Sequence, residues 1–532
     1  MNVFLMQPDR DFELGGKRPF NEAALEQDLE LGTLYGAMAQ GDKFLFDVAR
    51  HALLSGVDRP EEIRYRQDVL RDCLDHPEVV RAIYRIPIQA TENRRLGWTG
   101  IFSRYPSGIL SGARGMLQVF FAALRELREV ADRHAKEFES EGFRRFFAMI
   151  QRELDDEYFA VMEGHFKELA FRRGVLLSVE LGKGNEGTGY ILRKSDRGGW
   201  DWIRRVVGVG GPVYSFTLHP RDTAGGEALS ALRDRGLNLV ANAAAQSADH
   251  IESFLKALQR ELAFYIGCLN LAGQLHQLGE PIAFPDPSAS GVGQHRFREL
   301  YDLSLALTMK RKVVGNDVNA DGKDLVVITG ANQGGKTTFL RSVGIAQLMM
   351  QCGMFVPAES FSASICNGLF THFKREEDRT MTSGKFDEEL GRMSDMVDKL
   401  APRAMMLFNE SFAATNEREG SEIARQIACA LLDMKVKVFY VTHLYELANG
   451  FYEGGMDNAM FLRAERKPDG ERTFKLIAGR PLQTSYGRDV YEQVFGGDNG
   501  QPGARDPALP AQGVADLTAG FSGGVGTAPP PV

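Results

Sequence analysis

Residues 330–337 carry the pattern that most constrains this chain. They read Gly-Ala-Asn-Gln-Gly-Gly-Lys-Thr, which fits the phosphate-binding pattern G-x-x-x-x-G-K-[ST] at every fixed position. The apolar run Leu325 to Ile328 precedes them and predicts a buried strand, and Thr338 to Met350 has the apolar spacing of a helix. A plain glycine-rich turn would not need Lys-Thr after the glycines, so we predict a phosphate loop between a strand and a helix.

This loop predicts a binding role for each of its fixed residues. Backbone N–H groups of such a loop close around phosphate oxygens, and the helix N-terminus adds partial positive charge. Lys336 is expected to reach the outer phosphates and Thr337 to hold Mg²⁺, so ATP and Mg²⁺ are the expected cofactors. The residues expected to bind the nucleotide are Gly330, Asn332, Gly334, Gly335, Lys336, Thr337 and Thr338.

Composition limits the classes of protein that remain. A chain of 532 residues predicts two to four domains, and 43% hydrophobic with 25% charged residues is ordinary for a globular protein. The net charge of −8 argues against a chain that is basic throughout, although a local basic patch suffices for nucleic-acid binding. Five scattered cysteines without metal or redox spacing favour a reducing cytoplasm. Neither a signal segment nor a run of about 18 apolar residues is present, so no membrane span is expected.

The first half of the chain is predicted to be mainly helical. Residues 1–112 form a helical N-terminal region in which Glu22 to Ala39 has helical spacing, and Phe143 to Leu169 continues that pattern. Residues 113–293 contain two long helices, Ala113 to Phe138 and Asn242 to Leu278, and a helix pattern already resumes near Gly226 before the second of them.

A small β-containing insert is expected between those long helices, at residues 174–220. Its candidate strands are Gly174 to Leu181, Gly189 to Leu192 and Val213 to Leu218. After a Pro/Gly/Ser-rich boundary that ends at Gly293, residues 294–495 alternate strand and helix patterns, as in an α/β nucleotide-binding domain. Residues 496–532 are rich in Gly, Pro and Ala and predict a disordered tail.

Two further strand ends carry polar residues suited to phosphoryl chemistry. Met405 to Phe408 predicts a strand that ends in Asn409-Glu410. ATPases with a phosphate loop of this kind place an acidic pair at this position, which supports Mg²⁺ and activates water. Asn409 offers an oxygen without the charge, so we expect weaker Mg²⁺ binding, while Glu410 keeps the general-base role. The strand Val436 to Val441 leads to His443, which could bond to the γ-phosphate or sense its loss. The simpler alternatives are a turn that begins at Asn-Glu and a structural histidine.

A polar segment between these motifs runs into an amphipathic helix. Ser383 and Gly384 stand at its start and could present a hydroxyl and an N–H to a partner's γ-phosphate in a head-to-tail dimer. A simple N-cap by Thr382 or Ser383 explains the same residues equally well.

Together these motifs resemble the MutS family of DNA mismatch-recognition ATPases. The similarity covers residues 310–495 and follows the family's order. The matching segments are Thr329 to Gly344 around the phosphate loop, Gly353 to Ala358, Thr442 to Leu447, and Ser485-Tyr486-Gly487. Upstream, the two long helices and the insert look like the family's core, lever and clamp.

The resemblance implies that the insert contacts DNA. Arginine, lysine and tryptophan side chains there could neutralise phosphates and offer aromatic faces. The residues concerned are Arg193, Lys194, Arg197, Trp200, Trp202, Arg204 and Arg205. A solvated basic loop with two tryptophans in a local core is the alternative.

Departures from the family pattern modify these expectations. The chain starts almost at the helical core, so the N-terminal mismatch-reading domain is expected to be missing. The simple composition of the tail leads us to expect no appended nuclease-type domain. Asn409 replaces the usual Asp, which predicts slow turnover, and Val313 stands where relatives often place a Phe beside the adenine. The serine loop has only a loose counterpart in Ser383 to Phe386.

Two hypotheses follow from the sequence. The first is an ATPase that dimerises through its nucleotide-binding domains and couples ATP to binding of mismatched or branched DNA, in repair or recombination and with a possible repair-protein partner. The second is a nucleotide-gated scaffold with little hydrolysis and a protein partner in place of DNA. An ATPase of the ABC or chromosome-maintenance type ranks below both, because no Leu-Ser-Gly-Gly-type signature occurs.

Overall fold

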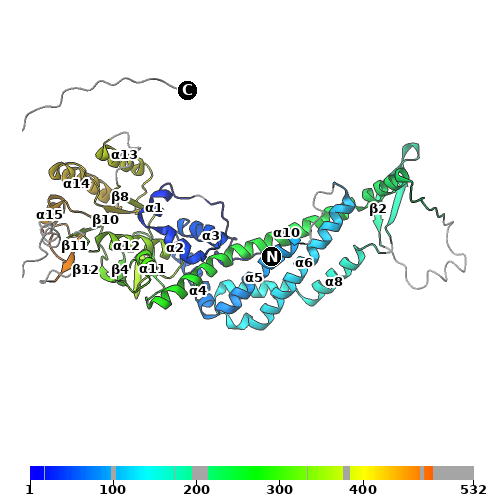
Figure 1. The fold of residues 1–532 in the computed structure, drawn as a ribbon, viewed down its shortest axis with the longest axis horizontal. Helices are drawn as coiled ribbons and strands as arrows, with labels where there is room; N and C mark the ends of the chain where they lie inside the picture. Colours follow the sequence, from blue (N-terminus) through cyan, green and yellow to red (C-terminus); the bar gives the residue numbers. More distant parts are fainter. Residues whose placement is uncertain are drawn as a thin grey trace, which may run out of the picture. The chain divides into compact units, whose positions relative to one another are not determined.

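The computed structural model describes residues 1–16, 18–96, 104–172, 174–194, 214–331, 333–375, 384–467 and 472–482. Residues Met1–Ser485 form one compact unit, in which a helical part precedes an α/β part (Figure 1). The predicted tail at 496–532 lies outside the described residues, as does the Ser485-Tyr486-Gly487 motif. The predicted domain boundaries at 112, 293 and 495 stay predictions.

Eight α-helices of the described residues precede the hairpin. Their bounds are α1 Glu22–Asp28, α2 Leu31–Ala39, α3 Lys43–Leu54, α4 Pro60–Asp75, α5 Pro77–Leu96, α6 Pro106–His134, α7 Glu141–Glu153 and α8 Asp156–Glu168. The predicted helix from Glu22 to Ala39 is divided, because Glu30 adopts a left-handed φ of 52° between α1 and α2. The pattern from Phe143 to Leu169 is divided too, since the side chain of Asp155 caps a new helix by accepting from Tyr158 N.

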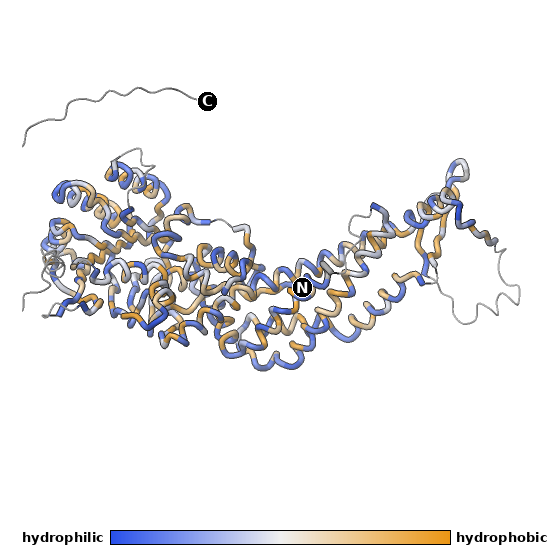
Figure 2. The backbone as a smooth tube through the Cα atoms, viewed as in Figure 1, coloured by the Kyte–Doolittle hydropathy of each residue, from blue (hydrophilic) through white to orange (hydrophobic). Residues whose placement is uncertain are grey.

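Helix α10 (Thr223–Leu278) spans 56 residues, about 84 Å at 1.5 Å per residue. It includes the helix pattern predicted near Gly226 and joins it to the long helix expected from Asn242. Asp222 caps its start by accepting from Gly225 N, and its alanine-rich first half favours helix. Gly279 ends it with a left-handed φ of 70°. Helices α6 and α10 pack along each other, and both change between hydrophobic and hydrophilic residues along their length (Figure 2).

Helix α6 has a composition that needs an explanation. Within the described part of the chain, Pro106–Glu137 is the one stretch long and apolar enough to cross a membrane by length and composition. Leu117, Phe120 and Leu124 on this helix are buried in the protein core. Packing against α10 and its neighbours therefore accounts for these buried apolar residues. The helix also begins at Pro106, before the predicted start at Ala113, and so runs through the predicted 112/113 boundary.

The insert contains the predicted hairpin. Strands β1 (Leu176–Leu181) and β2 (Gly187–Arg193) pair antiparallel, and a short 3-10 turn at Lys183–Asn185 joins them. The prediction of a third strand at Val213 to Leu218 is wrong where it can be compared, because Tyr214–Leu218 has irregular backbone. Tyr214 and Phe216 are largely exposed, so their apolar character does not reflect a paired strand.

The α/β part is built on a six-stranded sheet. The strand order is β12-β11-β6-β10-β9-β8; strands β11 to β8 are parallel to their neighbours, and β12 is antiparallel at the edge. The strand bounds are β6 Leu325–Thr329, β8 Leu369–Phe373, β9 Met405–Asn409, β10 Lys437–Val441, β11 Ala459–Arg466 and β12 Arg472–Ala478. The predicted strands before the loop, before Asn409 and before His443 are thus confirmed.

The helices and the second sheet complete this part. The helices are α11 Leu303–Met309, α12 Lys336–Gln351, α13 Lys385–Val397, α14 Glu417–Asp433 and α15 Tyr445–Glu453. The second sheet has the order β3-β7-β4-β5, with bounds β3 Asp286–Ser288, β4 His295–Leu300, β5 Asn316–Asn319 and β7 Ser360–Ser364. One continuous apolar core includes residues of the helical part and of both sheets, so the two parts share their packing.

Candidate nucleotide site

The predicted phosphate loop joins the buried strand β6 to helix α12, as expected. Gly330 and Gly335 have left-handed φ values of 119° and 87°, which favour glycine. A Cβ atom on Gly334 would lie 2.7 Å from the Ala464 Cβ atom and 3.0 Å from the Ala331 oxygen. The loop therefore requires glycine for both backbone conformation and space. Asn332 lies outside the described residues.

Lys336 is the first residue of α12 and is almost fully buried. Its Nζ donates to the backbone oxygens of Gly330 and Ala331, at 2.9 and 2.8 Å. Burial lowers the pKa of Lys336 to about 8, and the nearby charge of Glu410 opposes that shift. The ammonium group is thus held within the loop that the sequence predicts to surround phosphate.

The predicted magnesium ligands meet at the end of β9. Thr337 Oγ1 donates to Asn409 Oδ1 at 3.0 Å, which joins the first turn of α12 to the strand end. This hydroxyl and amide oxygen are in contact, and the Glu410 carboxylate follows Asn409 in the chain; all three are the kinds of oxygen ligand that Mg²⁺ accepts alongside nucleotide phosphates. The described residues contain no group of three or more His, Cys, Asp or Glu side chains that could hold a metal ion by itself. These three residues therefore fit Mg²⁺ that arrives with a nucleotide.

Glu410 and His443 also lie together, although 33 residues separate them in the chain. His443 Nε2 donates to Glu410 Oε1 at 2.8 Å, since a carboxylate can only accept. This hydrogen bond is the main reason why the pKa of Glu410 is held below its usual 4.5. Glu410 has a left-handed φ of 55°, which is uncommon for a residue other than glycine. The geometry thus joins the two strand ends that carry the predicted general base and the predicted phosphate sensor.

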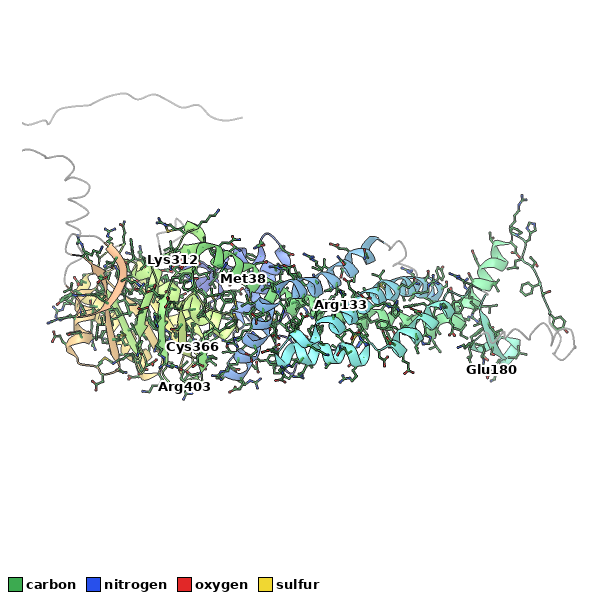
Figure 3. All side chains as sticks on the ribbon, turned by 90° about the horizontal axis from the view of Figure 1, so that it is seen from below. Met38, Arg133, Glu180, Lys312, Cys366 and Arg403 are labelled. Carbon is green, nitrogen blue, oxygen red and sulfur yellow. The ribbon has the colours of Figure 1, made fainter. Side chains whose placement is uncertain are left out.

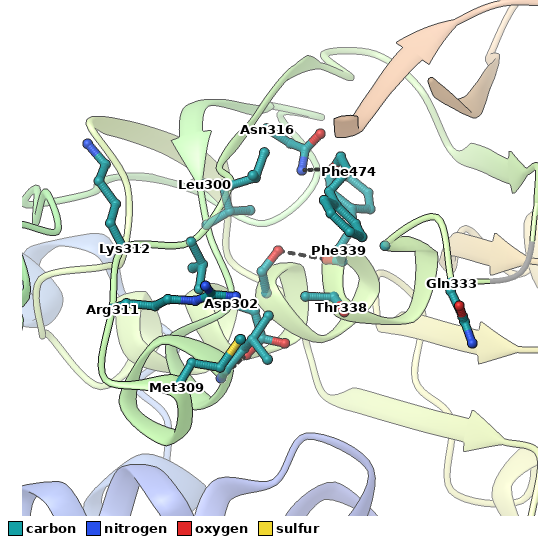
Figure 4. A pocket seen from close by; sticks show the side chains of 15 residues that line it. Leu300, Asp302, Met309, Arg311, Lys312, Asn316, Gln333, Thr338, Phe339 and Phe474 are labelled. Carbon is teal, nitrogen blue, oxygen red and sulfur yellow. Dashed lines mark hydrogen bonds between the residues drawn. The ribbon is translucent and has the colours of Figure 1, made fainter. Parts of the chain in front are cut away.

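A cavity of about 370 Å³ borders the phosphate loop (Figure 4). Gly335 and Thr338 contribute to one side, and the walls are mostly apolar, with Phe339, Phe474 and Val313 among them. Val313, which stands where the family resemblance implies a Phe beside the adenine, therefore lines a pocket next to the loop. Asn316 was not predicted; its Nδ2 donates to the Phe474 oxygen at 3.4 Å, and no local pattern marks either residue.

The remaining predicted site residues divide between the described and the undescribed parts of the chain. Gly384 precedes α13 as its N-cap residue, while Ser383 lies outside the described residues. Arg193 ends β2 and donates through Nε to Ser178 Oγ at 2.9 Å, and Lys194 pairs with Glu168 at 2.7 Å. Residues 195–213, which include Arg197, Trp200, Trp202, Arg204 and Arg205, lie outside the described residues.

The hairpin end of the insert has its own cavity. A space of about 560 Å³ lies between the end of α8, the hairpin and α10. Four cationic side chains line it: Lys167, Arg172, Arg193 and Lys194. Figure 3 shows Glu180 on this hairpin, so an acidic residue stands on the same element. The structure thus brings Arg193 and Lys194, two of the predicted DNA-contacting residues, together with Lys167 and Arg172, which were not predicted.

Comparisons with known proteins match both the helical part and the α/β part of the chain. The MutS2 N-terminal domain model matches residues 58–278, and the MutS domain V model matches residues 326–496. The first match covers most of the helical part, and the second covers the nucleotide site.

Individual relatives are similar over part of the chain. The endonuclease MutS2 of Pediococcus pentosaceus is 30% identical over 224 residues, 41% of this chain and 28% of that protein. The human MutS protein homolog 4 is 28% identical over 166 residues, 31% of this chain and 17% of that protein. The DNA mismatch repair protein MutS of Thermotoga neapolitana is 34% identical over 140 residues, 26% of this chain and 18% of that protein.

The matched part therefore spans little more than a quarter of the length of these relatives, at most. Both the helical part and the part that contains the candidate nucleotide site nevertheless match MutS family models. The chain belongs to the MutS family.

Proposed function

We propose that this chain binds and hydrolyses ATP and couples that reaction to DNA binding. The observation that supports hydrolysis most directly is that the start of α12, with Lys336 and Thr337, lies at the ends of the adjacent strands β9 and β10, where Asn409, Glu410 and His443 stand. In this proposal Lys336 and the loop N–H groups bind the phosphates, and the cavity beside the loop takes the base. Thr337, Asn409 and Glu410 would hold Mg²⁺, which neutralises charge on the transferring phosphoryl group.

The proposed reaction transfers the γ-phosphoryl group to water. The water oxygen forms a bond to phosphorus, the bond to the β–γ bridging oxygen breaks, and ADP leaves with that electron pair. Glu410 orients the water and accepts its proton, for which its depressed pKa keeps it ionised at neutral pH. His443 donates to Glu410 and is proposed to respond when the γ-phosphate is lost.

The proposed DNA contact is through the hairpin end of the insert. The cations Lys167, Arg172, Arg193 and Lys194 support it, because phosphate neutralisation is the main source of nucleic-acid affinity. We further propose dimerisation through the nucleotide-binding parts and a repair-protein partner in DNA repair or recombination. Five free cysteines support a reducing compartment, for which we propose the cytoplasm without a membrane partner.

The direct test is ATP hydrolysis by the purified protein with homoduplex, mismatched or branched DNA, at low and high salt. Lys336→Ala serves as the blank and Glu410→Gln tests the base. We expect one DNA form to stimulate turnover at low salt, and both variants to remove the stimulated activity. Wild-type turnover no faster than that of Lys336→Ala, under every condition, would refute hydrolysis.

A second candidate function is a nucleotide-gated scaffold that holds ATP. The observation in its favour is Asn409, which brings no negative charge to the proposed metal ligands. Asn409→Asp distinguishes the two candidates when turnover and Mg²⁺ dependence are measured side by side. A strong rise in turnover in this variant, from a native rate close to zero, favours the scaffold, whereas a native rate that DNA already stimulates favours the ATPase.

A further inference from the structure

The turn that carries Glu410 is held in an uncommon backbone conformation. Glu410 and Phe412 both have left-handed φ values, 55° and 63°, although neither is glycine. Such residues persist only where the surroundings fix them. Ser411 and Phe412 are fully buried, so the support must come from buried partners.

Glu389 of helix α13 supplies one such partner. The Phe412 N–H donates to Glu389 Oε2 at 2.6 Å, and the Glu389 side chain is 1% exposed. From helix α14, Gly420 closes the other side, because a Cβ atom there would lie 2.4 Å from the Phe412 oxygen. The turn after Glu410 is thus confined between α13 and α14.

His372 of strand β8 extends the same network. Its Nε2 donates to the Glu389 backbone oxygen at 3.0 Å, and its Nδ1 lies 2.7 Å from Ser411 Oγ. Burial lowers the pKa of His372 to about 4, so the ring is neutral near pH 7, and the Ser411 hydroxyl donates to the His372 backbone oxygen at 2.5 Å. Tyr440 on β10 donates to the Ser411 oxygen at 3.1 Å. Helix α13, which lies beside β8, therefore contacts the turn in two ways (Figure 1): directly through the Glu389 side chain, and through His372, which bonds to the Glu389 backbone oxygen.

We propose that Glu389 is a positioning residue for hydrolysis, acting through the Phe412 N–H to hold Glu410 in its water-activating position. The proposal rests on the proposed ATPase function. It follows that the position of α13, which begins next to Gly384, sets the geometry of the general base. Glu389 itself does not touch the reacting atoms, and the bond to Phe412 requires an acceptor without requiring a charge.

Two substitutions separate this role from plain structural support. Glu389→Ala removes the acceptor, whereas Glu389→Gln keeps an oxygen for the Phe412 N–H, loses the charge and places an NH2 group at the position of the buried Oε1. Asp395→Ala is the matched control, since Asp395 is exposed on the same helix. The measurements are kcat, KM and equilibrium ATP binding, together with the thermal midpoint and hydrogen–deuterium exchange of the peptide that contains Phe412.

We expect Glu389→Ala to lower kcat at least tenfold while ATP affinity changes less than twofold, with faster exchange at Phe412. Glu389→Gln should stay within threefold of the wild-type kcat, and Asp395→Ala should match the wild type. Equal kcat in Glu389→Ala and wild type would overturn the proposal, and so would equal losses in the Ala and Gln variants. If Glu389→Ala does not fold, a wild-type kcat in folded Glu389→Gln still supports the acceptor role, and a tenfold loss there overturns it.

Failure of the proposed function is recognised separately. It appears as wild-type turnover equal to that of Lys336→Ala, whatever residue stands at 389. In that case exchange at Phe412 decides on the contact itself: faster exchange in Glu389→Ala supports the positioning of the turn, and unchanged exchange overturns it.

Discussion

A buried carboxylate on α10 makes the stability of the fold depend on pH. Glu261 is fully buried and accepts three backbone N–H groups of the N-terminal segment, from Leu5 at 2.6 Å, Met6 at 3.0 Å and Phe12 at 2.7 Å. Burial raises the pKa of Glu261 from 4.5 to about 7, although the three donors favour the ionised form. The folded state therefore binds a proton more readily than the unfolded chain does between these pH values.

The sign of the effect follows from this difference in proton binding. The stability that proton binding by Glu261 gives the folded state is fully present below pH 4.5. It is lost as the pH rises through 7, because the folded state must then ionise a buried group. A shift of this size corresponds to roughly 3 kcal/mol in total, of which roughly 2–3 kcal/mol falls between pH 5 and 8.

The perturbation that isolates this effect is Glu261→Gln, which cannot titrate. Urea unfolding of both proteins at pH 5, 6, 7 and 8 gives the difference in unfolding free energy at each pH. The variant is less stable throughout, since its amide cannot accept all three N–H groups. We expect the difference to shrink by roughly 2–3 kcal/mol from pH 5 to pH 8. A difference that is constant, or that grows with pH, would refute the reasoning, because it would mean that the ionised carboxylate is as favourable in the fold as in water.

Three further predictions concern helix packing and the general base. Gly344→Ala on α12 places a Cβ atom 2.8 Å from two leucine side chains, so we expect it to lower the unfolding free energy by about 1–3 kcal/mol in urea titrations. Gly36→Ala on α2 meets no atom within 4 Å and should raise it by up to about 1 kcal/mol in the same titrations. His443→Ala removes the bond that depresses the pKa of Glu410, so the acid limb of the ATPase pH profile should move to higher pH, measured as kcat between pH 4 and 8.

Local sequence patterns predicted the strand, turn and helix at the centre of the candidate nucleotide site. Strand β6, the glycines and Lys336 are close in sequence, so one short pattern contains the strand, the turn and the helix start. The strands ending at Asn409 and Val441 could also be predicted, because parallel strands buried on both faces are continuous apolar runs.

Irregular and helix-start regions were predicted less well. Tyr214 to Leu218 has apolar residues at alternate positions, yet two of its aromatic side chains are exposed and no strand forms. Helical residues were predicted from near Gly226, but the long helix was expected only from Asn242, because apolar spacing is weaker before that residue. The Asp222 cap that starts the helix is a single residue. The pocket residues Asn316 and Phe474 come from separate strands, and only the packing of β12 beside β5 brings them together.

The acidic residues Glu389 and Glu261 show why these supporting contacts could not be predicted from the sequence. Each stands on a helix where spacing alone does not distinguish a buried acid from an exposed one. Each accepts N–H groups from irregular backbone far away in the sequence, 23 residues for Phe412 and about 250 for the N-terminal segment. Buried N–H groups outside helices and sheets must find an acceptor, and a carboxylate can serve several at once. The irregular turn or segment therefore determines that a hydrogen-bond acceptor is required. Which residue supplies the acceptor depends on which helix packs there, and that depends on the whole fold.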